Sequence, residues 1–556
     1  MSLQSAHQAY QSGDLNQAET LLGLHLLTYP DDARALHLGA LVAHRRRDFP
    51  TALTRIVEAS RDAGNLHEKR NTEGNIRIAL GDPLGAEAAF RAALAADPDY
   101  HPARFNLARH LFDQSAFREA ADEFRHLAAA EPGNAIAWRG LLNASLEGLQ
   151  LEEVAARLDE APLPGAEKAN IRARLAYCRN EFDAALEGLS SVIGDESVGA
   201  ESFVLALQIL HMQGRWAEAR TFADKTLGAY PDNPKIWGPA IRAFYKAGDM
   251  AEAKRWLAAA PSGVAVDTVR LEILIEEKRF DEAEKAGLDA LSGAPGYTPL
   301  MHRVCRAALG NSNPDLAQQV ADFGLRATPN DQLYYAVKAT AGRAKGQNYR
   351  WYFDYERFVR AYDLSAPDGW SDMASFNADL KAELEAHHGH SDAPLDQSLQ
   401  TGTQTLADLR YIETPAIQGY FQAIDAAVRD YLETIGQDRT HAFLSRNTGA
   451  YRVRGAWSVR LRSGGHHVNH VHPAGWISSA YYVDVPSGRG KEGWIKFGEP
   501  PAPLGEALGQ GPEHEIEPKP GRLVLFPSYL WHGTYPITGD KTRMTLPIDI
   551  LPAAPA

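Results

Sequence analysis

A period of 34 residues runs through about the first three-fifths of the chain and restricts its fold more than any other feature. Ten turn-forming positions carry the period, with steps of 30 to 34 residues: Asp14, Asp48, Asp82, Ala116, Gln150, Glu181, Arg215, Asp249, Arg279 and Asn313. In nine of the ten, alanine follows four residues later, and Val154 is the exception. A small side chain there lets two helices approach closely after a short turn. The period therefore predicts stacked helix–turn–helix units.

Proline marks the end of many of these units. The proline is followed by a helix-starting Asp or Asn within two residues at Pro30, Pro98, Pro132, Pro231 and Pro329. Proline cannot continue a helix, and Asp or Asn can begin the next one. Period and pattern together resemble tetratricopeptide repeats. We expect about ten helix pairs over residues 1–340, forming an all-α superhelix whose concave groove binds a peptide or protein partner, or else serves as a spacer or dimerisation surface.

The overall composition narrows the partners and the compartment. The formal net charge of −14 disfavours nucleic acid as a partner. Two cysteines, Cys178 and Cys305, predict no disulfide framework. The N-terminal residues have no signal-peptide pattern, and no apolar run approaches a membrane span. These features predict a cytoplasmic, soluble protein without a membrane partner.

The repeat pattern stops after Pro329, and we place a domain boundary near residue 345. In the second domain, residues 345–556, a helix is expected from Pro415 to an end at Gly436. From residue 451 the apolar residues alternate with period two in several short runs, the last of them over residues 543–550. Such runs predict an all-β sandwich or barrel with flanking helices. His387, His388 and His390 stand in a polar stretch and are interpreted as a solvated loop.

Three histidines in the β region suggest a metal site. His470 and His472 are two residues apart, so on an extended strand both side chains face the same side, and His532 supplies a third imidazole after another predicted strand. Imidazole suits iron, copper, zinc and nickel, and three protein ligands leave open positions for catalysis. Arg543 and Thr545 lie on one face of the last predicted strand and form a fork for a carboxylate.

Two sequence segments carry a family resemblance. Residues 465–483 (Gly-His-His-Val-Asn-His-Val-His-Pro-Ala-Gly-Trp-Ile-Ser-Ser-Ala-Tyr-Tyr-Val) and residues 520–534 (Pro-Gly-Arg-Leu-Val-Leu-Phe-Pro-Ser-Tyr-Leu-Trp-His-Gly-Thr) resemble 2-oxoglutarate/Fe(II)-dependent oxygenases. They resemble in particular a bacterial branch in which this domain follows tetratricopeptide repeats, and residues 402–405 match an upstream motif of that branch. The resemblance implies a double-stranded β-helix (jelly-roll, cupin-like) fold. It also implies Fe(II) held by a His-x-Asp/Glu…His triad, with 2-oxoglutarate held by an arginine about ten residues past the distal histidine.

By position, the resemblance assigns His470 and His532 as the proximal and distal ligands, and Arg543 with Thr545 as the 2-oxoglutarate site. The chain departs from the family at its acidic position, which is His472. Three outcomes are open: His472 ligates as a third imidazole, which we favour; water fills the position; or a nearby carboxylate such as that of Asp484 serves.

Four further residues are candidates for the pocket: Arg460, Asn469, Trp476 and Tyr482. We predict a 2-oxoglutarate-dependent dioxygenase that hydroxylates a peptide or protein side chain recruited by the repeats. One alternative is a non-catalytic repeat scaffold with a degenerate barrel. Another is a small-molecule oxygenase whose repeats mediate complex assembly.

Overall fold

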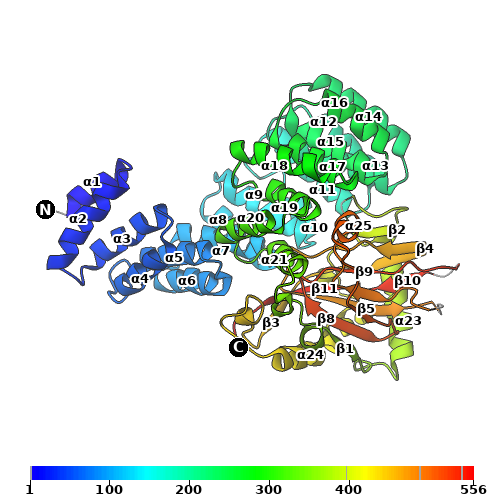
Figure 1. Cartoon of the computed structure of the whole chain (residues 1–556). Coiled ribbons are helices and arrows are strands. Elements are labelled where there is room, and N and C mark those ends of the chain that lie inside the picture. Colours follow the sequence, from blue (N-terminus) through cyan, green and yellow to red (C-terminus); the bar gives the residue numbers. More distant parts are fainter. Residues whose placement is uncertain (1–2, 396, 487–489, 540–541, 556) are drawn as a thin grey trace. The chain divides into compact units, whose positions relative to one another are not determined.

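The structure is a computed structural model that describes residues 3–395, 397–486, 490–539 and 542–555. Figure 1 labels its helices and strands. The chain divides into two compact units, Met1–Leu163 and Pro164–Ala556. The division between Leu163 and Pro164 lies within the helical repeats. The boundary that the sequence predicts near residue 345 is a different one, where helical repeats give way to strands. The two-domain description of the sequence therefore stays a prediction.

The first unit consists of helices arranged in pairs. Its helices are α1 (Leu3–Gln11), α2 (Leu15–Thr28), α3 (Ala33–Arg45), α4 (Phe49–Ala59), α5 (Leu66–Ala79), α6 (Pro83–Ala96), α7 (His101–Asp113), α8 (Phe117–Ala130), α9 (Ala135–Glu147) and α10 (Leu151–Arg157).

The second unit begins with the same kind of helix pairs. They are α11 (Gly165–Cys178), α12 (Phe182–Ser191), α13 (Gly199–Met212), α14 (Trp216–Ala229), α15 (Pro234–Lys246), α16 (Met250–Ala259), α17 (Val264–Glu276), α18 (Phe280–Gly293), α19 (Thr298–Gly310), α20 (Pro314–Ala327) and α21 (Gln332–Ala344).

The ten period positions are the N-cap residues of the even-numbered helices from α2 to α20. Some cap with a side chain, as Asp14 does by accepting from the Gln17 N–H. Others, such as Ala116, have no capping side chain. The shared feature is the preceding residue, which has φ between 54° and 85° at every unit: Gly13, Arg47, Gly81, Ser115, Leu149, Asn180, Gly214, Gly248, Lys278 and Ser312. A left-handed residue ends the first helix of each pair and turns the chain into the second.

The small residues four positions later lie where the helices of a pair meet. All nine alanines and Val154 are fully buried. A larger side chain would push the two helices apart, so the alanine spacing is a consequence of close helix packing.

The C-terminal part of the second unit is rich in antiparallel strands. They are β1 (Arg360–Asp363), β2 (Leu399–Gln404), β3 (Tyr451–Ala456), β4 (Val459–His467), β5 (Ile477–Asp484), β6 (Ile495–Phe497), β7 (His514–Ile516), β8 (Arg522–Pro527), β9 (His532–Thr534), β10 (Arg543–Thr545) and β11 (Ile548–Pro552). The larger sheet has the order β1-β8-β5-β10-β4-β2, with β11 paired to β5 and β3, and the smaller sheet has the order β7-β6-β9. The expected fold class, a helical-repeat superhelix followed by an antiparallel β-rich region, is confirmed.

Further helices lie among the strands along the chain, and α22, α23 and α24 contact strands of the larger sheet. The short helices are α22 (Tyr355–Phe358) and α25 (Ala502–Leu508), with 3-10 turns at Tyr349–Trp351, Leu409–Tyr411 and Leu444–Arg446. The longer ones are α23 (Met373–Glu385) and α24 (Pro415–Ile435), and α24 ends at Gly436 with φ 67° as the sequence predicts. Tyr420 of α24 donates to the carbonyl of Leu546, which joins this helix to the sheet.

One expected strand is divided in two. The alternation over residues 543–550 predicts a continuous strand, but β10 ends at Thr545 and β11 begins at Ile548. Pro547 lies between them and has no N–H for a sheet hydrogen bond. As a result, β10 pairs with β4 and β5, while β11 pairs with β5 and β3.

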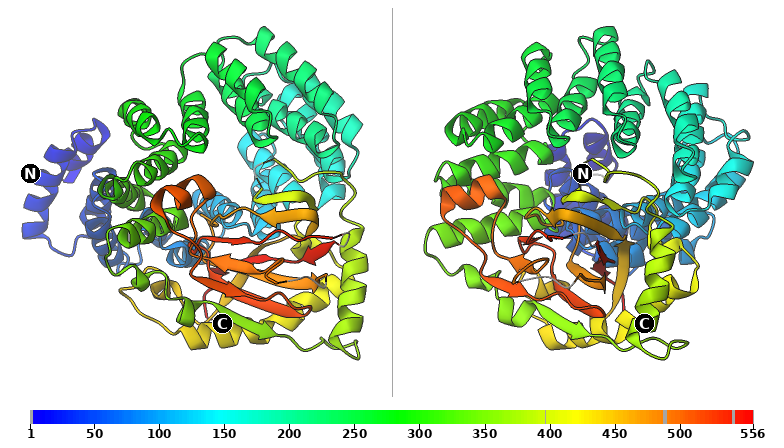
Figure 2. Two further views of the ribbon diagram at one scale, coloured as in Figure 1. Left: turned by 45° about the vertical axis from the view of Figure 1, so that its right-hand side comes forward. Right: turned by 90° about the vertical axis from the view of Figure 1, so that its right-hand side faces the viewer.

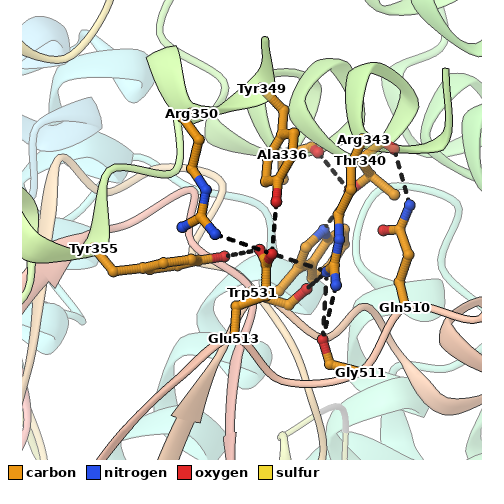
Figure 3. A network of polar contacts seen from close by, with 11 residues as sticks. Ala336, Thr340, Arg343, Tyr349, Arg350, Tyr355, Gln510, Gly511, Glu513 and Trp531 are labelled. Atoms are coloured by element: carbon orange, nitrogen blue, oxygen red, sulfur yellow. Dashed lines mark hydrogen bonds and ion pairs between the residues drawn. The ribbon is translucent and has the colours of Figure 1, made fainter. Parts of the chain in front are cut away.

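The last repeat packs directly on the β region, and one apolar core runs from Met301 to Leu551. In both views of Figure 2 the green helices of the last repeats lie beside the orange and red strands. The indole N–H of Trp531 donates to the Thr340 hydroxyl of α21 at 2.8 Å. Nearby, the Glu513 carboxylate is the centre of a polar network (Figure 3). It accepts from the hydroxyls of Tyr349 and Tyr355, at 2.6 and 2.9 Å, and pairs with Arg343 and Arg350.

Among the described residues, no helix is both long enough and apolar enough to cross a membrane.

The helix contacts in the second unit give a stability prediction. Ala253→Leu places a larger side chain at a fully buried position of α16 and should destabilise the protein by about 1–3 kcal/mol. Ala251→Leu is the matched control, because Ala251 is exposed on the same helix and its replacement should change stability by less than about 0.5 kcal/mol. Denaturant unfolding of the full chain measures both variants. Equal effects of the two would contradict the packing role of the alanine positions.

Candidate metal centre

Three histidines converge at the junction of the two sheets. Candidate ligand atoms of His470, His472 and His532 all lie within 4.8 Å of one another. His470 and His532 form an isolated antiparallel bridge in which each backbone N–H donates to the other's carbonyl, at 2.9 and 3.0 Å. The backbone N–H of His472 donates to the Ser528 carbonyl at 3.0 Å. Two separate strand contacts therefore position the three rings.

The hydrogen bonds of the rings orient their other nitrogens toward one another. Nδ1 of His470 bonds the Val468 carbonyl and Nδ1 of His532 bonds the Leu530 carbonyl, both at 2.8 Å. A carbonyl only accepts, so each Nδ1 carries the proton and each Nε2 presents a lone pair. Nδ1 of His472 is 2.7 Å from Oδ1 of Asp549, which gives this ring the same orientation.

The spacing of the nitrogens suits a cation. Nε2 of His470 and Nε2 of His472 are 3.1 Å apart. Two nitrogens bound to one metal at about 2.0–2.1 Å and at right angles would be separated by about 3 Å. Lone pairs that face each other at this distance repel unless a cation lies between them. The donor set therefore fits a divalent transition metal.

The charge states of two residues agree with a ligand role. Burial lowers the pKa of His470 to about 3, with a further contribution from His472, and burial holds the pKa of His532 well below its ordinary value. Both rings are neutral at neutral pH, as metal ligation requires.

Asp549 is a neighbour of the cluster that the sequence analysis missed. Burial opposes ionisation of this carboxyl, but His472 and the Ser478 hydroxyl outweigh it, and the pKa of Asp549 is lowered. The carboxylate accepts from Ser478 at 2.7 Å as well as from His472. Metal-ligating histidines commonly donate their other N–H to a carboxylate. The sequence offered one signal for Asp549. It is an even number of residues from Arg543 and Thr545, and residues at even spacing on a strand lie on the same face.

Arg543 lines a cavity together with the three histidines and is 2% exposed. Its guanidinium carbon is 5.0 Å from the centre of the Tyr482 ring. Within the described residues, its Nε and one terminal nitrogen have no hydrogen-bond partner. Burial lowers the pKa of Arg543. A buried, unpaired guanidinium is unfavourable in isolation, so the arrangement fits an anionic ligand such as the 2-oxoglutarate carboxylate.

A cavity of about 1110 Å³ contains the three histidines, Arg543, Thr545 and Asn469. Asn469 is held by a hydrogen bond from its side-chain amide to the Pro500 carbonyl. Tyr482 lies opposite Thr545 in the β5–β10 pairing and contributes its ring beneath Arg543. The cavity therefore brings together five of the residues that the sequence assigned to the metal and co-substrate, and one of the pocket candidates.

Two pocket candidates, Arg460 and Trp476, do not line this cavity. Arg460 is opposite Met544 and Thr403 in the sheet, whereas Arg543 is opposite Leu461. Opposed residues share a face, so Arg460 is on the other side of the sheet from Arg543, and it donates to the His388 carbonyl. Trp476 is fully buried in the apolar core, where its indole N–H donates to the Phe443 carbonyl.

The expectation of a solvated loop at His388 and His390 is corrected. His388 and His390 are 4% and 8% exposed, so they are buried and do not form a solvated loop. The His388 ring is hydrogen-bonded to the hydroxyls of Thr403 and Ser458. It therefore packs against the outer face of the sheet. Asp484 forms an ion pair with Lys381 at 2.6 Å, so its carboxylate is engaged away from the histidine cluster.

Family models agree with this two-part organisation. A model described as "Putative 2OG-Fe(II) oxygenase" matches residues 455–549. Two models described as "Tetratricopeptide repeat" match residues 77–144 and 210–267, and residues 172–234. The chain thus combines tetratricopeptide repeats with a domain of this 2OG-Fe(II) oxygenase family, which confirms the resemblance.

The solved structures that match are more distant. A structure of Naa15/Naa10 bound to HypK-THB is 14% identical over 64% of this chain and 62% of that chain, with a TM-score of 0.30. The chain thus spans less than two thirds of that protein's length. An O-GlcNAc transferase mutant from Thermobaculum terrenum is 27% identical over 23% of this chain and 25% of that chain, with a TM-score of 0.22. The MamA protein is 14% identical over 32% of this chain and 90% of that chain, with a TM-score of 0.25. No curated protein matches the chain.

The contact between His472 and Asp549 gives a prediction for metal binding. Asp549→Asn should weaken the affinity for Fe(II) or Co(II) by about 10–100-fold, because an amide is a weaker acceptor and removes the negative charge behind the ring. Asp484→Asn is the control and should leave metal affinity unchanged, because Asp484 pairs with Lys381. Anaerobic calorimetric titration measures both. Unchanged affinity in Asp549→Asn would show that this carboxylate does not support a metal ligand.

Proposed function

We propose that this protein is an Fe(II)- and 2-oxoglutarate-dependent oxygenase that hydroxylates a side chain of a peptide or protein. One observation carries the proposal: three imidazoles, of which that of His532 is buried, direct their Nε2 atoms toward one another in the cavity that also contains the buried, partly unpaired guanidinium of Arg543.

In this proposal His470, His472 and His532 hold the metal. Ligation by His472 is favoured over water, because Asp549 fixes the ring with Nε2 3.1 Å from that of His470. Asp484 is disfavoured by its ion pair with Lys381. In the family pattern a carboxylate binds the metal directly. Here the carboxylate would be that of Asp549, which contacts the ligand His472 and does not bind the metal itself. Such an arrangement leaves positions open for the co-substrate and dioxygen.

Arg543 and Thr545 are the proposed anchor for the far carboxylate of 2-oxoglutarate. The two residues share a face of β10, and the Tyr482 ring supports the guanidinium. When bound, the iron and 2-oxoglutarate supply an oxidation by dioxygen that releases succinate and carbon dioxide and adds an oxygen atom to a C–H bond. The protein orients the co-substrate and excludes water, since Arg543 and His532 are 2% and 6% exposed.

A peptide substrate is favoured by the extent of the cavity. Its wall includes the three histidines and also residues of α13, α15, α17 and α19, each of which is the first helix of a repeat. Repeat arrays use this inner surface to bind extended partners. At about 1110 Å³, the cavity also exceeds the roughly 300–1,000 Å³ of most small-molecule sites.

The test of the activity is succinate release that depends on 2-oxoglutarate and Fe(II). His532→Ala should abolish it by removing a ligand. Arg543→Met should weaken 2-oxoglutarate binding by about two orders of magnitude, because loss of one partner of a buried charge pair costs about 2–5 kcal/mol.

Arg460→Met is the control, because Arg460 lies on the opposite face of the same sheet, and it should retain turnover. Fe(II)-loaded wild-type protein that neither binds 2-oxoglutarate nor releases succinate would overturn the proposal. A non-catalytic scaffold with a degenerate barrel would then be the better description.

A further inference from the structure

The cavity at the histidine cluster is basic, although the chain as a whole is acidic. Its described lining contains seven Arg or Lys residues and four Asp or Glu residues, in a chain whose net charge is −14. The excess positive charge is concentrated on two repeat helices. Arg242 and Lys246 are on α15, and Arg303 and Arg306 are on α19.

Part of this charge is neutralised within the repeats. Glu272 of α17 lies between the two basic helices and pairs with Arg242 at 3.0 Å and with Arg303. Burial opposes ionisation of Glu272, but the two arginines outweigh it and lower its pKa to about 2. One carboxylate thus serves two guanidinium groups, and both of its oxygens are engaged.

Arg306 is left without such a partner. It lies three residues after Arg303 on the inner side of α19 and lines the cavity. The Arg306 side chain is partly buried, and its buried Nε–H has no hydrogen-bond acceptor in the described part of the chain. Burial, and then repulsion by Arg303, lowers the pKa of Arg306, and attraction by Glu272, Tyr245 and Glu276 opposes this only in part. An arginine stays charged in proteins, and a buried charge is unfavourable unless an opposite charge pairs with it.

The cavity continues from these helices to the metal cluster. The same lining includes Arg306, the three histidines and Arg543. Arg543 has its own proposed anion, the co-substrate. Arg306, on the repeat side, forms no ion pair in the described part of the chain, so it is available to a second anionic group on whatever the repeats deliver to the metal.

We propose that the repeat side of the cavity binds an acidic segment of the polypeptide substrate, with an Asp or Glu carboxylate paired to Arg306. This inference rests on the proposed function and names its substrate class. A guanidinium binds a carboxylate in a two-point fork, so Arg306 would select the segment and fix its position relative to the metal. Arg306 acts as a substrate-binding residue and takes no part in the oxidation.

A binding experiment with peptide pools tests the proposal. The probes are N-acetylated, C-amidated twelve-residue peptides of random sequence, each pool with Asp, Glu, Asn, Gln or Lys fixed at its centre. The full chain is immobilised with Co(II) and a 2-oxoglutarate analogue that is not decarboxylated. We expect at least about tenfold greater retention of the Asp and Glu pools than of the Asn and Gln pools. A further pool with neutral side chains and a free C-terminal carboxyl separates a side-chain from a terminal carboxylate.

Three variants locate the selectivity. Arg306→Gln should remove the preference for acidic pools, and Arg306→Lys should retain part of it. Arg255→Gln is the control, because Arg255 is a 57% exposed arginine of the same array that already pairs with Asp224 and Glu252. It should behave as the wild type.

Thermal unfolding separates binding from a structural role. If Arg306 serves to bind a ligand, Arg306→Met should leave the unligated Tm unchanged or raise it, because a partly buried charge without an ion-pair partner is removed. A lower Tm in Arg306→Met would assign the residue to the fold and overturn the proposal. Equal retention of acidic and amide pools by the wild type would overturn it as well.

The outcomes also separate this inference from the proposed activity. Acidic peptides that bind through Arg306, in a protein that releases no succinate, would support the binding site and contradict the oxygenase. Succinate release with no preference for acidic peptides would contradict the binding site alone.

Discussion

The packing of the last repeat helix against the chain segment that leads into β9 is the contact on which the second unit depends. Trp531 inserts into the shared core and donates to Thr340 of α21, and the next residue is His532. Successive residues of an extended segment point to opposite sides. One side of this segment therefore faces the repeats, and the other faces the histidine cluster. The Glu513 network and the apolar core keep these two surfaces together, so the helical array forms part of the wall of the site.

The features that the sequence predicted well depend on local chemistry. Each repeat has a left-handed residue followed directly by an N-cap residue at its turn. Because this turn is made by a few consecutive residues, the 34-residue period can be recognised in the sequence. The buried alanines follow from the same local register. His470 and His472 could be placed together because spacing by two on an extended chain needs no knowledge of the partner strand. The helix from Pro415 to Gly436 was marked at both ends by proline and glycine.

The features that the sequence did not reveal depend on pairing between distant strands. Arg460 was a pocket candidate by alternation, but its register with Met544 places it on the outer face. A shift of one residue in register reverses the face of every side chain on a strand, and a single sequence does not contain that register. Asp549 was missed for a related reason. Its contact with His472 joins residues 77 positions apart, and spacing along one strand does not identify such a partner.

The backbone bridge between His470 and His532 fixes the spacing of two proposed metal ligands independently of the third. The separation of these two ligands is set by main-chain hydrogen bonds, and it does not depend on the side chain at position 472. A different side chain at position 472 would therefore leave the backbone bridge between His470 and His532 intact. In the proposed metal site the negative charge is on Asp549, and it acts on the cluster through the hydrogen bond to His472.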